Sequence, residues 1–91
     1  MSKFSVSLLP TEVERNTITL VKTLRKNEGW SQAELAERSG VSLGSIKRFE
    51  TKGKISYESL LQLLYTLNYL ESFYSVLKLE NNQDIEQLFS I

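Results

Sequence analysis

The sequence lacks two residue types that carry much of protein chemistry, because none of its 91 residues is cysteine or histidine. Disulfides, thiolate or imidazole catalysis and the usual zinc sites are therefore excluded. Catalysis would have to rest on carboxylates, lysines or hydroxyls, and no pair of these stands in an obvious pocket-forming context. We expect neither an enzyme nor a bound cofactor or metal.

Long apolar runs are also missing. No window approaches the roughly 18 consecutive apolar residues of a membrane span, and residues 1–10 lack the apolar region and cleavage site of a signal peptide. We therefore expect a soluble, cytoplasmic protein. Its length and its 41% content of hydrophobic residues suffice for one compact domain with one core.

Neither sign of charge is in excess, since 11 lysines and arginines balance 11 aspartates and glutamates. A neutral chain counts against a simple basic nucleic-acid-binding domain. The charges are unevenly placed, however: residues 1–54 carry ten basic against six acidic residues, and residues 55–91 carry one against five. This asymmetry predicts one end that meets phosphates and another that meets a different partner.

The stretch 31–49 predicts two short helices joined by a tight turn. Ser31 can accept from the amide of Glu34, whose carboxylate can reach back to the amide of Ser31, as in a capping box. Gly40 stands where the first helix must end, because glycine adopts the left-handed conformation without steric penalty. Ser42 can then cap the second helix, so the two helices must cross steeply. The residues expected to pack at this crossing are Leu35, Ala36, Val41, Ile46 and Phe49.

The second of these helices, over about 42–51, is expected to keep one face free of the core. A helical wheel places Gly44, Arg48 and Thr51 opposite the core positions. This outer row is flanked by Ser45, Lys47 and Lys52. Such a helix fits the major groove of B-DNA, where arginine can pair with the two acceptors of guanine. The simpler alternative is a helical bundle in which these cations only solvate an exposed face.

Helical periodicity predicts three more helices. Thr11 and Glu14 match a second capping box, which opens a helix that runs to about Asn27. Ser56 can cap a leucine-rich helix that ends near Asn68, a residue that tolerates the left-handed conformation. A fifth helix, packed against the first or the fourth, is indicated by Leu70, Phe73, Tyr74 and Leu77.

We expect the domain to span residues 11–78, between an N-terminal arm, residues 1–10, and a C-terminal tail or short helix, residues 79–91. Alternating apolar residues in the arm fit a short strand, an arm ordered by a partner or a frayed end. They are Phe4, Val6 and Leu8. The tail offers Asp84 as a cap and Ile85, Leu88 and Phe89 as one apolar side, which can close the core or dock on another protein.

Together, Gln32, Ala36, Gly40 and Ile46 stand at spacings that resemble the Cro and lambda-repressor type of helix-turn-helix, the XRE family. The resemblance extends over about residues 17–70. It implies an all-α, five-helix repressor-type domain with a central helix-turn-helix, whose partner is double-stranded operator DNA. Repressors of this type usually form homodimers, because two recognition helices about 34 Å apart meet successive major grooves.

The resemblance also implies roles for single residues. Gln32 matches a glutamine that contacts a DNA phosphate, and Arg25 and Glu50 match an internal salt bridge between the first and third helices. The positions from which the family's third helix reaches bases or backbone are held by Leu43, Gly44, Lys47 and Arg48. On this basis we expect Ser42 and Lys52 to anchor phosphates with Gln32, and Ser45 to adjust the fit to the bases.

The sequence departs from the family pattern within the third helix. Leu43 and Gly44 stand where many relatives carry polar side chains, so fewer polar base contacts are expected there. A leucine can instead touch the methyl group of thymine. Thr51, Lys52 and Gly53 replace the commoner asparagine-glycine ending of this helix.

The stretch from Arg48 to Leu64, with the aromatic-rich segment after it, is similar to the HipB-like antitoxins encoded beside HipA-type kinases. That resemblance implies a dimer that represses its own operon and binds a kinase toxin. A surface for the second subunit or partner is expected at Tyr65, Tyr69, Phe73 and Val76. The alternatives are a phage-type repressor and a protein-binding adaptor that has lost DNA binding.

Overall fold

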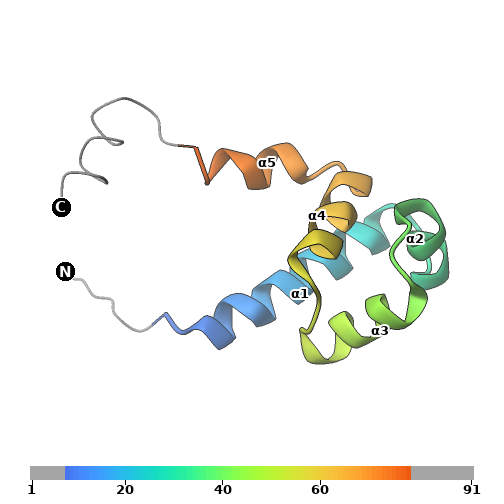
Figure 1. Cartoon of the computed structure of the whole chain (residues 1–91), viewed down its shortest axis with the longest axis horizontal. Helices are drawn as coiled ribbons and strands as arrows, with labels where there is room; N and C mark the ends of the chain where they lie inside the picture. The colour runs from blue at the N-terminus through green and yellow to red at the C-terminus, as the bar shows by residue number, and fades with distance from the viewer. Residues whose placement is uncertain (1–7, 79–91) are drawn as a thin grey trace.

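The computed structural model describes residues 8–78, which form five helices and no strand within that range (Figure 1). The helices are α1 (Pro10–Asn27), α2 (Gln32–Ser39), α3 (Leu43–Lys52), α4 (Tyr57–Thr66) and α5 (Leu70–Ser75). The all-α, five-helix architecture predicted from the sequence is therefore confirmed. The predictions for the tail, and for the arm before Leu8, lie outside the described residues.

The start of α1 differs from the prediction. The helix does not open at a capping box of Thr11 and Glu14, because Pro10 is already its first residue and Leu9 is the N-cap. The amide of Leu9 instead donates to Oε1 of Glu12 at 3.3 Å. Proline is favoured at the first helical position, since its fixed φ suits the helix and its missing N–H would be unpaired there.

The predicted turn between α2 and α3 is present. The Oγ atoms of Ser31 and Ser42 accept from the amides three residues on, at 3.0 and 3.1 Å. Gly40 ends α2 with a φ of 80°, and its N–H donates to the carbonyl of Ala36. Only half of the predicted capping box forms at α2, because the carboxylate of Glu34 accepts from Arg38 one turn further along the same helix, at 3.1 Å.

Glycine is also required where α3 ends. Gly53 has a φ of 75°, and its N–H donates to the carbonyl of Phe49 at 2.8 Å. A Cβ atom on Gly53 would lie 3.2 Å from Cδ1 of Ile18 on α1. Both the left-handed backbone and the close approach of α1 therefore favour glycine at this position.

Helices α4 and α5 meet at a tight corner. Ser56 caps α4 through a bond from the amide of Ser59, and Asn68 takes the left-handed conformation with a φ of 61°. Helix α4 ends at Thr66, close to the predicted end. Helix α5 is shorter than predicted, because it ends at Ser75 rather than at Leu77.

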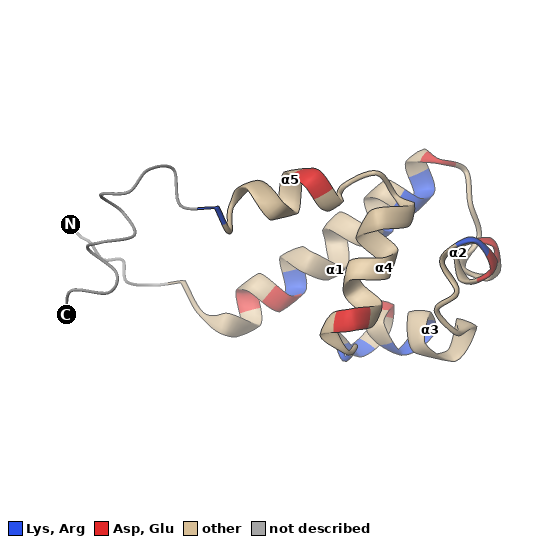
Figure 2. Ribbon diagram, turned by 45° about the horizontal axis from the view of Figure 1, so that its top comes forward, with Lys and Arg blue, Asp and Glu red and all other residues tan. Residues whose placement is uncertain are grey.

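The core lies where α1, α2, α3 and α4 meet, and α5 packs on the outer side of α4. The fully or nearly fully buried apolar side chains are Val21, Leu35, Val41, Ile46, Phe49, Leu63, Leu64 and Leu67. The core residues predicted at the crossing of α2 and α3 are among them, with Ala36 partly buried. Figures 1 and 2 place α3 and α5 on opposite sides of α4. The surface of α5 is therefore spatially separate from that of α3.

None of the helices formed by residues 8–78 is long and apolar enough to cross a membrane.

Candidate nucleic-acid interface

Helix α3 has one buried and one exposed face. Ile46 and Phe49 are 0% and 2% exposed, and Glu50 lies beside them. The opposite face is exposed to solvent at Leu43, Gly44, Lys47, Arg48, Thr51 and Lys52, with Ser45 half-buried at its edge. The residues predicted to contact DNA from α3 are thus together on one accessible surface.

The exposed face of α3 is positively charged. It carries Lys47, Arg48 and Lys52, whereas the only acidic residue of the helix, Glu50, is buried and paired. Glu71 lies on α5, on the side of α4 opposite to α3 (Figure 2), and neither salt bridge formed within residues 8–78 involves the three cations. The arrangement therefore presents uncompensated cations on one helix, as binding to a phosphate backbone requires.

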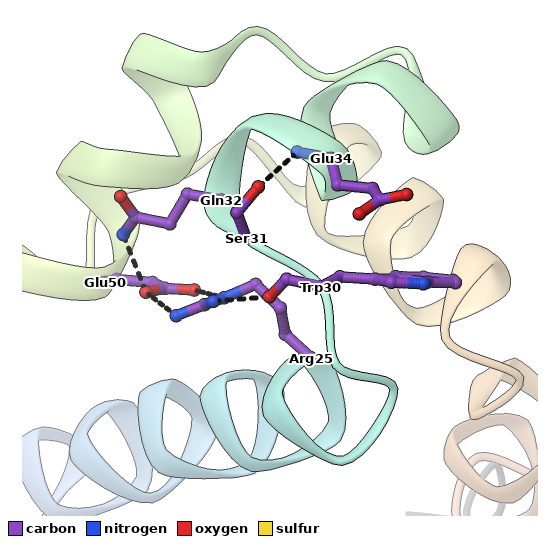
Figure 3. Close-up of polar contacts among 6 residues, drawn as sticks. All are labelled: Arg25, Trp30, Ser31, Gln32, Glu34 and Glu50. Carbon is purple, nitrogen blue, oxygen red and sulfur yellow. Dashed lines mark hydrogen bonds and ion pairs between the residues drawn. The ribbon is translucent and has the colours of Figure 1, made fainter.

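A buried ion pair fixes α3 against α1. Nε of Arg25 donates to Oε2 of Glu50 at 2.9 Å, and Nη2 of Arg25 donates to Oε1 of Glu50 at 3.0 Å (Figure 3). The side chains are only 10% and 3% exposed. Nη1 of Arg25 also donates to the carbonyl of Trp30, at 2.8 Å. The pair implied by the family resemblance is thus present, with two parallel contacts and a third partner for the guanidinium.

Gln32 also belongs to this hydrogen-bond network. The sequence predicted only a phosphate contact for this residue and not a bond to Glu50. Its Nε2 donates to Oε1 of Glu50 at 2.8 Å, so that Glu50 accepts from both α1 and α2 (Figure 3). A primary amide has two N–H donors, and one of them is committed here. The half-buried side chain of Gln32 can therefore offer one further donor while it stays bonded to Glu50.

The hydroxyl groups at the start of α3 are bonded to one another. Oγ of Ser42 accepts from the amide of Ser45 at 3.1 Å and donates to Oγ of Ser45 at 2.8 Å. Both predicted DNA contacts from serine therefore also belong to the helix cap. One further exposed cation, Lys54, lies in the segment after α3 and was not among the residues predicted to contact DNA. The sequence signal for it was its position directly after Gly53, in the basic first part of the chain.

The four residues predicted to contact a second subunit differ in exposure. Tyr65 and Val76 are 67% and 75% exposed, whereas Tyr69 and Phe73 are partly buried against the core. Tyr65 and Phe73 line a groove of about 510 Å³ between α4 and α5. The other lining residues are Tyr57, Leu61, Asn68, Leu70, Glu71, Tyr74 and Leu77. We call this the α4–α5 groove; the four-residue spacing of Tyr57, Leu61 and Tyr65 was the sequence signal for its α4 side.

Within residues 8–78, no three acidic side chains come together as a metal site would require.

The comparisons with known proteins give one match. A model of the helix-turn-helix family matches residues 21–71, which is more than half of the chain and includes α2, α3 and α4. Searches among curated proteins and among solved structures gave no match.

Replacing Glu50 by alanine is expected to cost about 3–5 kcal/mol of unfolding free energy, because it leaves the Arg25 guanidinium buried without its counter-charge. Urea unfolding of the purified variants measures this. The double replacement Arg25→Met with Glu50→Leu should cost clearly less, since neither charge is then left unpaired. A loss below about 1 kcal/mol for Glu50→Ala would contradict the structural role of the pair.

Proposed function

The chain belongs to the helix-turn-helix family, in its XRE type, and is thus a DNA-binding transcription regulator; from this premise we propose that it is a sequence-specific repressor. In this proposal α3 enters the major groove of an operator. The observation that carries the proposal is the division of α3, whose apolar residues are buried while its three cations are exposed. In a purely structural bundle these cations would only solvate an exposed face, and the family match over residues 21–71 favours DNA binding over that alternative.

The proposed contacts divide into two kinds. Lys47 and Arg48, on the outer face of α3, read base edges together with Leu43, Gly44 and Ser45. Gln32, Ser42 and Lys52 anchor phosphates. Anchoring contacts add affinity for every sequence, whereas contacts to base edges distinguish one operator from another. The ion pair of Arg25 and Glu50 supports both kinds, because it holds α3 and Gln32 in a fixed relation.

Arg48 and Lys52 allow a direct test of this division. Arg48→Ala should cost about 1–3 kcal/mol on the selected operator and relax the preference at one base pair, because arginine pairs with guanine through two hydrogen bonds. Lys52→Ala should weaken binding to all sequences alike and reduce the slope of log affinity against log salt by about one. Fluorescence anisotropy on operator and scrambled duplexes, at several salt concentrations, measures both effects.

Lys26→Ala is the matched control, because Lys26 is an exposed cation in the last turn of α1, outside both α3 and the α4–α5 groove. It should change neither the affinity nor the salt slope. Unchanged operator affinity in Arg48→Ala would contradict the proposal that Arg48 reads a base edge. An adaptor that kept the fold without DNA binding would show no salt-dependent specific complex at all.

The repressor is proposed to act as a homodimer joined through the α4–α5 groove. Two facts support this choice of surface. The groove is lined mainly by tyrosine, leucine and phenylalanine, and four of these residues, Tyr57, Tyr65, Tyr74 and Leu77, are more than half exposed. The groove also lies between α4 and α5, and α5 is on the side of α4 opposite to α3 (Figures 1 and 2), so a second copy bound there leaves both recognition helices accessible to DNA.

A charge placed in this groove should separate the subunits. Tyr65→Glu is expected to shift the chain from dimer to monomer in sedimentation experiments, because it buries an unpaired carboxylate at the interface. Operator affinity should fall with it, since the two half-sites are no longer bound together. Gln62→Glu adds the same charge at an exposed position of α4 outside the groove and should leave the dimer intact. A wild-type chain that sediments as a monomer on operator DNA would contradict the proposal.

A finer proposal is that this regulator is the antitoxin of a HipA-like kinase. The support is the similarity of its middle region to HipB-like proteins and the acidic balance of residues 55–91, which suits a basic patch on a partner. Binding through this second part would leave α3 free for DNA.

The kinase proposal is tested with the product of the neighbouring reading frame. Co-expression should yield a purified complex in which the kinase is inhibited, and Glu58→Gln, which lies outside the α4–α5 groove, should weaken that complex without lowering operator affinity. Because Glu58 is exposed, this replacement removes a charge from the surface and should leave the fold unchanged. A neighbouring gene for a phage integrase or lytic protein, with no complex formed, would favour the phage-type repressor instead.

A further inference from the structure

The first turn of α3 differs chemically from the rest of its exposed face. The cations lie in the second and third turns, at Lys47, Arg48 and Lys52, whereas the first turn begins with Leu43 and Gly44. In a helix-turn-helix, the N-terminal residues of the recognition helix are the ones that meet base edges. The chemistry of this turn therefore decides what the helix can distinguish.

Leu43 is exposed without a structural reason. Its exposed fraction is 36%, and it is neither part of the buried core nor among the partly buried residues packed against it. It stands one helical turn before Lys47, on the same side of α3. An isolated solvent-exposed leucine is common on protein surfaces. At the tip of a recognition helix, however, it is available to any apolar group that the groove offers.

Gly44 is also unexplained by the fold. Its φ is outside the left-handed region, and a Cβ atom built on it would meet nothing within 4 Å. The three other glycines of the chain all have positive φ values and thus a backbone reason to be glycine. Glycine in a helix lowers stability relative to alanine. The open backbone at Gly44 therefore leaves room for a group that approaches from outside the protein.

Side-chain hydrogen-bonding groups are scarce in this turn. The hydroxyl of Ser42 donates to Oγ of Ser45 and accepts from the amide of Ser45, so its bonds are made within the cap. Leu43 and Gly44 have no polar side-chain atoms. The backbone N–H groups of Leu43 and Gly44, which have no acceptor within the helix, can still donate to a base. Adenine, guanine and thymine all present acceptors in the major groove, so these donors do not single out one base. Thymine presents the one apolar group of the major groove, its C5 methyl.

We infer that Leu43 and Gly44 form an apolar reading surface that selects thymine through its methyl group. The inference rests on the DNA-binding function proposed above and adds the base class that the first turn recognises. Leu43 contacts the methyl group, and the missing side chain of Gly44 lets the base edge come close enough for that contact. Lys47 and Arg48, one turn further along, hold the helix at this depth in the groove.

The test uses the full-length chain and DNA from which the methyl groups are removed. Operators are selected from a random duplex library. Each is then synthesised once with thymine and once with uracil in its place, because uracil differs from thymine only in lacking the C5 methyl group. The selected sites should contain thymine at a fixed position of each half-site. Binding of the wild type should weaken about three- to fivefold for each buried methyl that is removed.

Leu43→Ala separates a methyl contact from an effect of uracil on the DNA itself. This variant should bind the thymine operator about as weakly as the wild type binds the uracil operator, and it should lose little more when the methyl is removed. Its urea unfolding should match that of the wild type, because Leu43 is outside the core. Equal methyl sensitivity in both proteins overturns the inference while the repressor function stands. Absence of any selected sequence overturns both.

Gly44→Ala tests the close approach. The added methyl meets open space and suits a helix, so the midpoint of thermal unfolding should rise by a few degrees. Operator affinity should fall at least severalfold at the same time. Thr23→Ala is the matched control, because Thr23 is exposed on the face of α1 away from Val21 and should gain helix stability without any change in affinity. A Gly44→Ala protein that is more stable and binds equally well overturns the role of Gly44.

Discussion

The buried ion pair of Arg25 and Glu50 is the contact on which the exposed surface of α3 depends. A charge taken out of water is tolerated only when it is paired and hydrogen-bonded, so neither residue can be displaced without a large loss. Glu50 accepts from Arg25 on α1 and from Gln32 on α2. The network therefore fixes how α3 is rotated about its own axis, and thereby which residues of α3 face the solvent.

Packing and electrostatics agree on that rotation. Ile46 and Phe49 lie on the same face of α3 as Glu50, and both are almost completely buried. Apolar burial gives most of the stability but tolerates small rotations, whereas the bonds between a guanidinium and a carboxylate have a fixed direction. Rotation of α3 by one residue would bury Lys47 and expose Phe49. The core thus holds the helix in place, and the ion pair specifies its orientation.

The parts of the fold that were predictable from the sequence are those with local causes. The caps at Ser31, Ser42 and Ser56 and the left-handed ends at Gly40 and Asn68 follow from residue types at fixed spacing. Predictions were wrong where two local signals competed. Helix α1 begins at Pro10 and not at the capping pattern of Thr11 and Glu14. The carboxylate of Glu34 accepts from Arg38 and not from the amide of Ser31. The bond of Gln32 to Glu50 and the partial burial of Tyr69 and Phe73 depend on tertiary packing, which no local pattern contains.

The separation of α3 from α5 bears on how a neutral chain can act on DNA. Three exposed cations on α3 release few counterions, so one copy alone has a small electrostatic contribution to affinity. Two copies joined through the α4–α5 groove double that contribution and bind a second half-site at high effective concentration. Contacts of Leu43 and Gly44 to base methyls add discrimination that salt does not screen. Affinity in the proposed repressor therefore comes from dimerisation and specificity from an apolar first turn, so a strongly basic chain is not needed.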